Sequence, residues 1–184
     1  MNLLVAANLL AFLVTQTYAT PVQEFPLAQV RLLDGPFKEA MDRNAGWLLL
    51  LDPDRLLAGF RESAGLEPKA LRYGGWEGQG VAGHSLGHHL SACAAMSAQG
   101  DVRFTERVNY IVHELALCQE AGGDGYIGAI PEGRRVFSEI ARGEIRAENF
   151  NLNGVWVPWY TMHKVMAGLR DAWRLAGNDE ALSV

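Results

Sequence analysis

Apolar residues recur at helical spacing along two long stretches of the chain. The first stretch covers residues 102–121 and carries an apolar stripe made of Phe104, Val108, Ile111, Leu115 and Cys118. The second runs from Pro158 to about residue 176, and its buried positions are expected to be Met162, Val165, Met166, Leu169 and Trp173. Side chains three and four residues apart share one face of a helix, so both patterns predict amphipathic helices.

Three more helices follow from end signals and composition. Proline is favoured as the first residue of a helix, so a helix is predicted to begin near Pro36, and its helical pattern stops at Asp52-Pro53. A shorter helix is predicted after Pro53, ending near Gly65, and an alanine-rich helix over about 84–99. Upstream, LAQVRLL (27–33) alternates well enough to predict a short strand in an otherwise extended segment.

Sharp turns and long loops alternate between these helices. Gly100-Asp101 and Gly177-Asn178-Asp179 each close one helix and open the next, whereas residues 64–83 and 122–155 are expected to form long loops. The order helix, turn, helix, loop is typical of stacked helical hairpins. In such a stack all long loops lie at one edge, where a pocket can form. The chain also stops inside a fresh helical pattern, so we expect an all-α front part of a longer domain.

Composition and the first residues refine this picture. The 184-residue chain is 49% hydrophobic with a net charge of −5, and it has no block of like charge that would indicate a nucleic-acid partner. Leu3–Val14 is an apolar run too short for a membrane span, and small residues follow it at Thr17 and Ala19. No Lys or Arg precedes the run. Even so, we expect residues 1–19 to be a signal peptide, with residues 20–184 exported and free of the membrane after cleavage.

The two cysteines and two of the tryptophans are interpreted as core residues. Cys93 and Cys118 lie on consecutive antiparallel helices and would be separated along the helix axes by roughly 13 Å. A disulfide needs Cα atoms within about 7 Å, so we expect two buried free thiols. Trp47 and Trp173 fall within apolar helical stripes and are expected to be buried.

Three histidines crowd the start of the helix at residue 84. His84 and His88 have the i, i+4 spacing of a metal site, but the glutamate of the H-E-x-x-H motif is replaced and no third ligand is nearby. We therefore do not predict a metal site there. His89 points about 100° away from His88, so the two cannot line one small pocket equally well. The alternative is that these three histidines are simply solvated residues at the end of a helix. His113, in the middle of another helix, is expected to be structural.

Aromatic residues accompany the histidines in two distant places. Trp76, Glu77 and Gln79 lie in the glycine-rich loop and are expected to be exposed there, immediately before the histidine helix. Trp156, Trp159 and Tyr160 precede His163 at the start of a second helix. Flat rings stack on the apolar face of a sugar, and imidazoles, amides and carboxylates bond its hydroxyls, so this mixture predicts a carbohydrate pocket.

Four motifs, in this order, resemble one known family. GGWEGQG (74–80), GHSLGHHLSA (83–92), DGYI (124–127) and VPWYTMHKVMAGLRDAW (157–173) resemble glycoside hydrolase family 127, the β-L-arabinofuranosidases, from about Pro26 to the C-terminus. The resemblance implies the N-terminal portion of an (α/α)6 toroid and retaining hydrolysis of terminal β-L-arabinofuranosides in arabinose-containing glycans. It also implies a cysteine nucleophile bound to zinc in a site of three cysteines and a glutamate.

The resemblance assigns sugar-binding residues to this chain but no catalytic ones. It implies that His163 contacts arabinose and that His84 or His88 reaches the same pocket, with Trp76, Gln79 and Trp159 as further lining residues. The zinc ligands and the acid/base glutamate of the family are not in this chain, and Cys93 and Cys118 match neither. We therefore expect the chain to be inactive by itself.

Two alternatives stay open at this stage. One is another helical-toroid carbohydrate enzyme, such as a lyase, which would need basic residues to hold a uronic acid. Its local candidates are Arg134, Arg135 and Arg142, which we expect to be solvated loop charges. The other is a non-catalytic glycan-binding helical protein that keeps the pocket and has no nucleophile.

Overall fold

The fold is built almost entirely of helices. The computed structural model describes residues 22–184, so the predicted signal peptide lies outside the described residues. Its helices are α1 (Pro36–Leu50), α2 (Pro53–Ser63), α3 (His84–Ala98), α4 (Val102–Gly122), α5 (Gly133–Ala141), α6 (Pro158–Ala176) and α7 (Glu180–Ser183). Two short 3-10 helices, η1 (Leu27–Gln29) and η2 (Gly75–Gly78), complete the helical elements of the described chain. The all-α prediction is confirmed.

Local sequence signals account for most of the helix ends. The Asp52 carboxylate accepts a hydrogen bond from the Asp54 amide, 2.9 Å away, and caps α2. Asp101 caps α4 in the same way, accepting from the Arg103 amide at 3.1 Å. The predicted starts at Pro36, His84 and Pro158 are confirmed; Pro36 and Pro158 suit a first helical turn, whereas Gly83, with a positive φ, precedes His84.

Two segments differ from their predictions. LAQVRLL does not form a strand; it contains the 3-10 turn η1, and the described residues offer it no partner strand. The predicted loop 122–155 contains α5 and an antiparallel sheet of three two-residue strands, β1 (Ala147–Glu148), β2 (Asn151–Leu152) and β3 (Val155–Trp156). Long-range bonds hold this segment: Arg134 donates to the carbonyl of Ser63, and Asn153 donates to Glu139.

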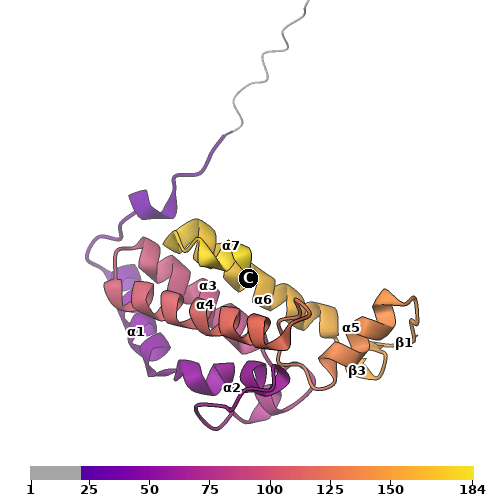
Figure 1. The fold of residues 1–184 in the computed structure, drawn as a ribbon. Helices are drawn as coiled ribbons and strands as arrows, with labels where there is room; N and C mark the ends of the chain where they lie inside the picture. The colour runs from indigo at the N-terminus through magenta and orange to yellow at the C-terminus, as the bar shows by residue number, and fades with distance from the viewer. Residues whose placement is uncertain (1–21) are drawn as a thin grey trace, which may run out of the picture.

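Helices α3 and α6 run side by side and in the same direction (Figure 1). The contacts follow the same order along both helices: Gly87 contacts Lys164 and Val165, and Leu90, further along α3, contacts Gly168, further along α6. This order shows that the two helices are parallel. A Cβ atom on Gly87 would collide with the carbonyl of Lys164 and lie 2.8 Å from the amide nitrogen of Val165. Glycine therefore permits this close backbone approach, which a side chain would prevent.

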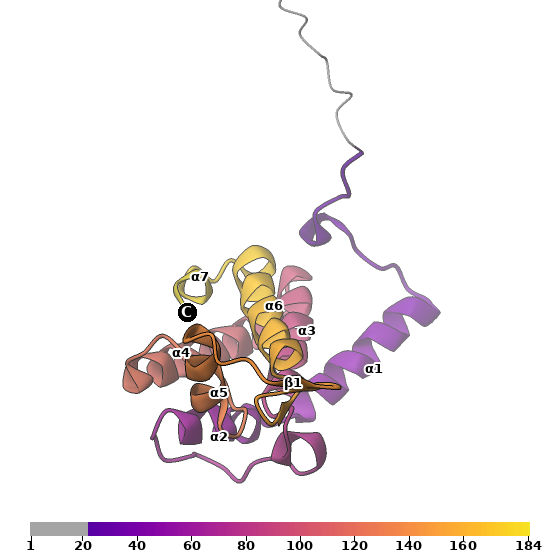
Figure 2. The same ribbon diagram turned by 90° about the vertical axis from the view of Figure 1, so that its right-hand side faces the viewer.

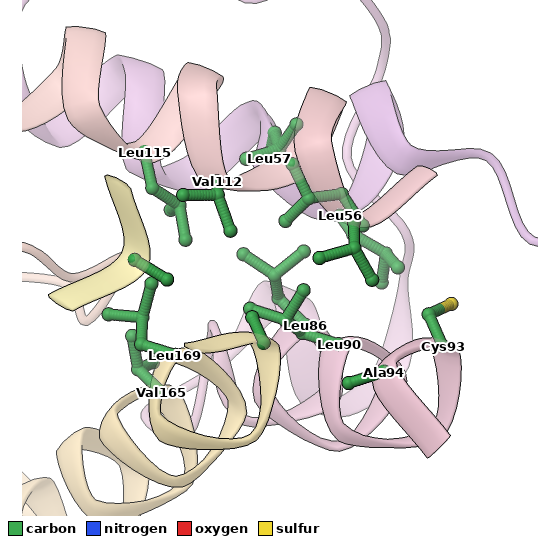
Figure 3. Packing of buried hydrophobic residues seen from close by; sticks show 14 of the residues in the cluster. Leu56, Leu57, Leu86, Leu90, Cys93, Ala94, Val112, Leu115, Val165 and Leu169 are labelled. Atoms are coloured by element: carbon green, nitrogen blue, oxygen red, sulfur yellow. The ribbon is translucent and has the colours of Figure 1, made fainter. Parts of the chain in front are cut away.

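The main hydrophobic core lies between α3, α4, α6 and α2. Side chains from all four helices converge in it (Figure 3), among them Leu57, Leu86, Leu90, Val112, Leu115, Val165 and Leu169. The predicted stripe of α4 is buried along its whole length, from Phe104 to Cys118. Helix α3 is thus buried on several sides, which fixes the position of its first turn.

Three predicted core residues are instead exposed. Trp47 on α1 is 57% exposed, and Met166 and Trp173 on α6 are 58% and 39% exposed. Helix α1 stands at the margin of the molecule (Figure 2) and buries only Ala45 and Leu48. An apolar pattern predicts the faces of a helix, but it does not say which faces have a packing partner.

The hairpin turns occur where they were predicted. Gly100 and Gly177 adopt positive φ angles of 90° and 69°, which reverse the chain after α3 and α6. Asn178 donates to Asn109 on α4 at 2.8 Å and thereby ties the second turn to the first hairpin. No helix among the described residues is long and apolar enough to cross a membrane.

Candidate functional site

The first turns of α3 and α6 lie at the same end of the molecule because the two helices are parallel and packed together. Gly83, with a φ of +101°, turns the glycine-rich loop into α3, and Val157, with a φ of +41°, turns β3 into α6. Two segments about eighty residues apart in the sequence therefore deliver their histidines and aromatic residues to one place.

His84 is the centre of an aromatic cluster at this end. Its ring centroid lies 5.7 Å from that of Trp76, 6.1 Å from that of His88 and 6.1 Å from that of Tyr160. Trp76 comes from the glycine loop, the two histidines from α3 and Tyr160 from α6. The cluster thus joins both predicted groups of site residues.

Glu77 orients His84. It was predicted to be exposed, but it is buried, and its carboxylate accepts hydrogen bonds from the amides of Gly83 at 2.8 Å and Ser85 at 3.1 Å. The Nδ1 atom of His84 lies 3.2 Å from this carboxylate and 2.8 Å from the carbonyl of Val81. Both neighbours can only accept, so Nδ1 carries a hydrogen, and Nε2 is the ring nitrogen that is left for a ligand.

His88 is kept in its neutral form. Partial desolvation, followed by the positive charge of Lys164 and the neighbouring imidazoles of His84 and His163, lowers the pKa of His88 below its ordinary value of 6.5, although the side chain keeps contact with solvent. A neutral imidazole can donate from one nitrogen and accept at the other, as a sugar hydroxyl requires.

A cavity of about 540 Å³ adjoins the cluster and extends toward α1. Aromatic, imidazole and aliphatic side chains line it, together with one amide and one buried carboxylate: Trp47, Tyr73, Trp76, His84, His88, His89, Leu48, Leu51, Leu56, Asn44 and Glu77, with Gly74, Ser85 and Ala92. No lysine or arginine is among these lining residues. The size and the few convergent polar groups are those of a small-ligand site.

The predicted site residues are distributed unevenly around this cavity. Trp76, His84 and His88 line it, whereas His163 is exposed beside it, one turn after Tyr160 on α6. Gln79 is exposed, and its amide ends η2 by donating to the carbonyl of Trp76. Trp159 lines a different cavity and packs edge-to-face on Phe137, with centroids 5.0 Å apart.

That second cavity, of about 780 Å³, lies along the other side of α6. Its walls are mostly apolar, with Trp159, Met162, Met166, Leu169 and Trp173 prominent among them. Tyr126, Arg170 and Arg174 also line it, but no histidine, aspartate or glutamate side chain is among its lining residues.

The cysteines do not form a metal or nucleophile site here. Both are free and buried, and burial raises the pKa of Cys93 to about 12 and that of Cys118 to about 11, which is opposite to the shift that a thiolate ligand needs. Within residues 22–184, no group of three or more His, Cys, Asp or Glu side chains could hold a metal ion. These residues do not fit the zinc–thiolate site that the resemblance implies, and no reaction step through zinc is derived from them.

The three arginines considered for a uronic-acid site are engaged elsewhere. Arg135 and Arg142 are exposed, as predicted, and Arg134 is partly buried; Arg134 and Arg135 lie on α5 rather than in a loop, and Arg142 directly follows this helix. Arg134 pairs with Asp124, Arg135 with Glu139 at 2.8 Å, and Arg142 with Glu144 at 2.9 Å. None of the three lines the cavity beside His84.

Sequence reasoning placed Tyr160 in the aromatic group beside His163, but it did not assign Trp47 or His89 to the pocket. Trp47 and His89 gave no signal in the sequence, since their relation to the pocket depends on how α1 packs against α3. His113, predicted to be structural, is distant from this site in the fold and lies 3.2 Å from Glu180, so that it connects α4 with α7.

Comparison with known protein families agrees with this architecture. The model of the β-L-arabinofuranosidase GH127 catalytic domain matches residues 29–184, which is most of the chain. No curated protein matches the sequence. This family has an α/α toroid fold, so the helical hairpins are part of such a toroid, and its members are glycoside hydrolases that act on carbohydrates. Because the family model covers residues 29–184, the chain belongs to the catalytic-domain family of glycoside hydrolase family 127.

Proposed function

We propose that this chain supplies the sugar-binding side of a retaining glycosidase that releases terminal β-L-arabinofuranose from arabinose-containing glycans. The observation that carries the proposal is the cluster of Trp76, His84, His88 and Tyr160 at the start of α3 and α6. The family supplies the class of reaction. The cluster supports the assignment of these side chains to the sugar.

The chemistry of the cluster suits a neutral sugar. Exposed rings such as Trp76, 63% exposed, offer an apolar face against which the C–H groups of a sugar can pack. His84 and His88 offer nitrogens that accept from or donate to hydroxyls. No lysine or arginine lines the cavity itself, which disfavours the lyase alternative there; the cation beside the cluster is Lys164, whose Nζ lies 5.2 Å from the ring centroid of Tyr160.

We further propose that the described chain does not hydrolyse arabinofuranosides on its own. Its two thiols are buried and held in their protonated form, so neither supports a nucleophilic role. A chromogenic β-L-arabinofuranoside incubated with the purified chain should release no product. Turnover by this chain would contradict the proposal and would require a nucleophile among its own residues.

His163 and His113 provide a matched test of the sugar site, because both are exposed histidines on long helices. His163→Ala should weaken the binding of methyl β-L-arabinofuranoside about tenfold, the effect of losing one well-placed hydrogen bond to a ligand. His113→Ala should leave binding unchanged. Titration calorimetry or ligand-observed NMR measures both, and equal effects of the two substitutions would contradict the assignment.

We also propose that the protein is exported, on the strength of the apolar run Leu3–Val14 and the small residues after it. N-terminal sequencing of the protein from the expressing cells should find a mature end close to residue 20. A protein that retains Met1 and stays in the cytoplasm would refute this proposal.

A further inference from the structure

We propose that Lys164 on α6 determines specificity at the sugar site by donating a hydrogen bond from its ammonium group to one hydroxyl of the terminal arabinose. This inference rests on the proposed function and deepens it, because it adds a charged donor to a site otherwise built of imidazoles and aromatic rings. The sequence patterns assigned no role to this lysine. Its pairing, its position and its effect on a neighbouring imidazole carry the proposal.

Lys164 differs from the other lysines of the chain in its lack of a carboxylate partner. The sequence contains three lysines, and the other two are paired: Lys38 with Asp42, and Lys69 with Glu114 at 2.6 Å. Within the described part of the chain, no aspartate or glutamate forms an ion pair with Lys164, although the residue is partly buried. An ammonium has three N–H donors and no acceptor, so these donors are available to a ligand.

The backbone holds Lys164 at the close approach of α3 and α6. Its carbonyl is the group that a Cβ atom on Gly87 would strike, and Gly87 directly precedes His88. The Nζ atom of Lys164 lies 5.2 Å from the ring centroid of Tyr160, and that centroid is 6.1 Å from the centroid of His84. The ammonium therefore stands beside the cluster of rings that we assign to the sugar.

The charge of Lys164 also favours the neutral form of His88. Desolvation contributes most to the lowered pKa of His88, the charge of Lys164 comes next, and the imidazoles of His84 and His163 contribute less. The carboxylate of Glu77 is occupied by two backbone amides, and α1 brings no charged side chain to the cavity beside the cluster. A neutral imidazole can accept a hydrogen bond, whereas the ammonium can only donate. A sugar hydroxyl both donates and accepts, so such a pair of groups suits it.

A hydroxyl suits this ammonium better than the carboxylate of an acidic sugar. No lysine or arginine lines the adjoining cavity, so a carboxylate would find no second cation there. The one charged group among the lining residues is the carboxylate of Glu77, and the chain as a whole has a net charge of −5. Both repel an anion. Lys164 therefore selects a neutral sugar that presents a hydroxyl oxygen to it.

Lys164→Met tests the ammonium, because methionine keeps an unbranched apolar side chain and removes the charged donors. Titration calorimetry with methyl β-L-arabinofuranoside should show binding weakened at least ~10-fold, the loss expected for a hydrogen bond from a charged donor. Lys164→Arg keeps a cationic donor and should lose less affinity. Lys38→Met is the matched control, since Lys38 pairs with Asp42 on α1 and lines a different cavity, and it should bind like the unchanged chain.

Deoxy analogues distinguish a direct hydrogen bond from a general effect on the site. The 2-, 3- and 5-deoxy forms of methyl β-L-arabinofuranoside each lack one hydroxyl. Lys164→Met should weaken two of these analogues as much as it weakens the parent glycoside. It should leave the third unchanged, because the hydroxyl that accepts from Lys164 is already absent from it. Equal weakening of all four ligands would overturn the proposal.

The pKa of His88 provides a readout that a purely structural role of Lys164 would not move. Loss of the positive charge should raise this pKa toward 6.5 in Lys164→Met, and Lys164→Arg should keep it low, as an NMR titration of the imidazole measures. If this pKa does not rise, or if Lys164→Met binds the arabinoside as tightly as the unchanged chain, the role of Lys164 is refuted. The proposed function still stands if the arabinoside binds and His163→Ala weakens it. If the arabinoside does not bind the unchanged chain, both proposals fail.

Discussion

Glu77 links the glycine loop, the first turn of α3 and His84 through a single carboxylate. It accepts from two backbone amides at the start of the helix and lies against the Nδ1 atom of His84. A negative group at a helix N-terminus is favoured by the helix dipole as well as by these bonds. The residue therefore positions His84, the histidine that we propose binds the sugar, without needing to touch the sugar itself.

Replacement of Glu77 by alanine should affect both stability and the site. Removing the carboxylate leaves two buried amides unpaired, which we expect to cost about 1–3 kcal/mol of the free energy of unfolding. Urea denaturation measures this cost, and ¹⁵N NMR of the imidazole should show that the preference of His84 for the Nδ1–H tautomer weakens.

Glu120→Ala is the matched control, because this residue is exposed near the end of α4. Its effect should stay within about 0.5 kcal/mol, as for most surface substitutions. A Glu77→Ala variant as stable as the control, with an unchanged His84 tautomer, would show that the carboxylate does not position the histidine.

At the scale of the elements, the contact between α3 and α6 decides whether the site exists. The two helices approach so closely at Gly87 and Gly168 that their backbones touch. Their parallel direction then brings Tyr160 and His163 beside His84 and His88. Neither helix carries a complete site by itself.

Gly87→Ala should therefore disturb the site as well as the fold. The added methyl group would overlap the carbonyl of Lys164, so we expect a loss of about 1–3 kcal/mol in the free energy of unfolding and weaker binding of the arabinoside. Gly46→Ala on α1 is the control, since a Cβ atom there meets nothing, and it should stabilise the chain by about 0.5–1 kcal/mol. Equal effects of the two substitutions on stability would contradict the close packing of α3 and α6.

At the scale of the whole molecule, the buried imidazole of His89 makes stability depend on pH. Burial, and to a lesser degree the charge of Arg107, lowers the pKa of His89 from 6.5 to about 4. The unfolded chain therefore binds a proton at a higher pH than the folded chain. The stability that this residue contributes is complete above pH 6.5 and is lost as the pH falls toward 4.

The pKa shift of His89 sets the size of this loss in the free energy of unfolding, which amounts to at most about 3 kcal/mol. The carboxylates Asp124 and Glu139 are ion-paired, and hydrogen bonds from Arg134 and Arg135 are the chief reason that their pKa values are lowered. Their protonation therefore reduces stability mainly below pH 4.5. Urea denaturation at pH 7.0 and pH 5.0 should therefore show a smaller loss of stability for His89→Phe than for the unchanged chain. An identical loss in both would mean that His89 does not stay neutral in the folded protein.

Much of this protein is determined by the sequence alone. Asp52 and Asp101 cap helices through bonds to amides two residues away, and Pro36 and Pro158 begin helices because their fixed φ suits a first turn. The motifs around His84 and His163 identify the family that the match over residues 29–184 confirms. These features depend on neighbours in the chain, so they can be predicted from its pattern.

Only the tertiary structure decides which side chains are covered and which meet. Among the described residues, no helix covers Trp47 or Trp173 of the apolar stripes, whereas Glu77, in a glycine loop, is buried against the start of α3. Arg134 ties helix α5 to the end of α2, and Asn153 ties the small sheet to Glu139 of α5. The physical reason is the same in each case: burial and pairing are properties of contacts between distant segments, and periodicity along the chain does not encode them.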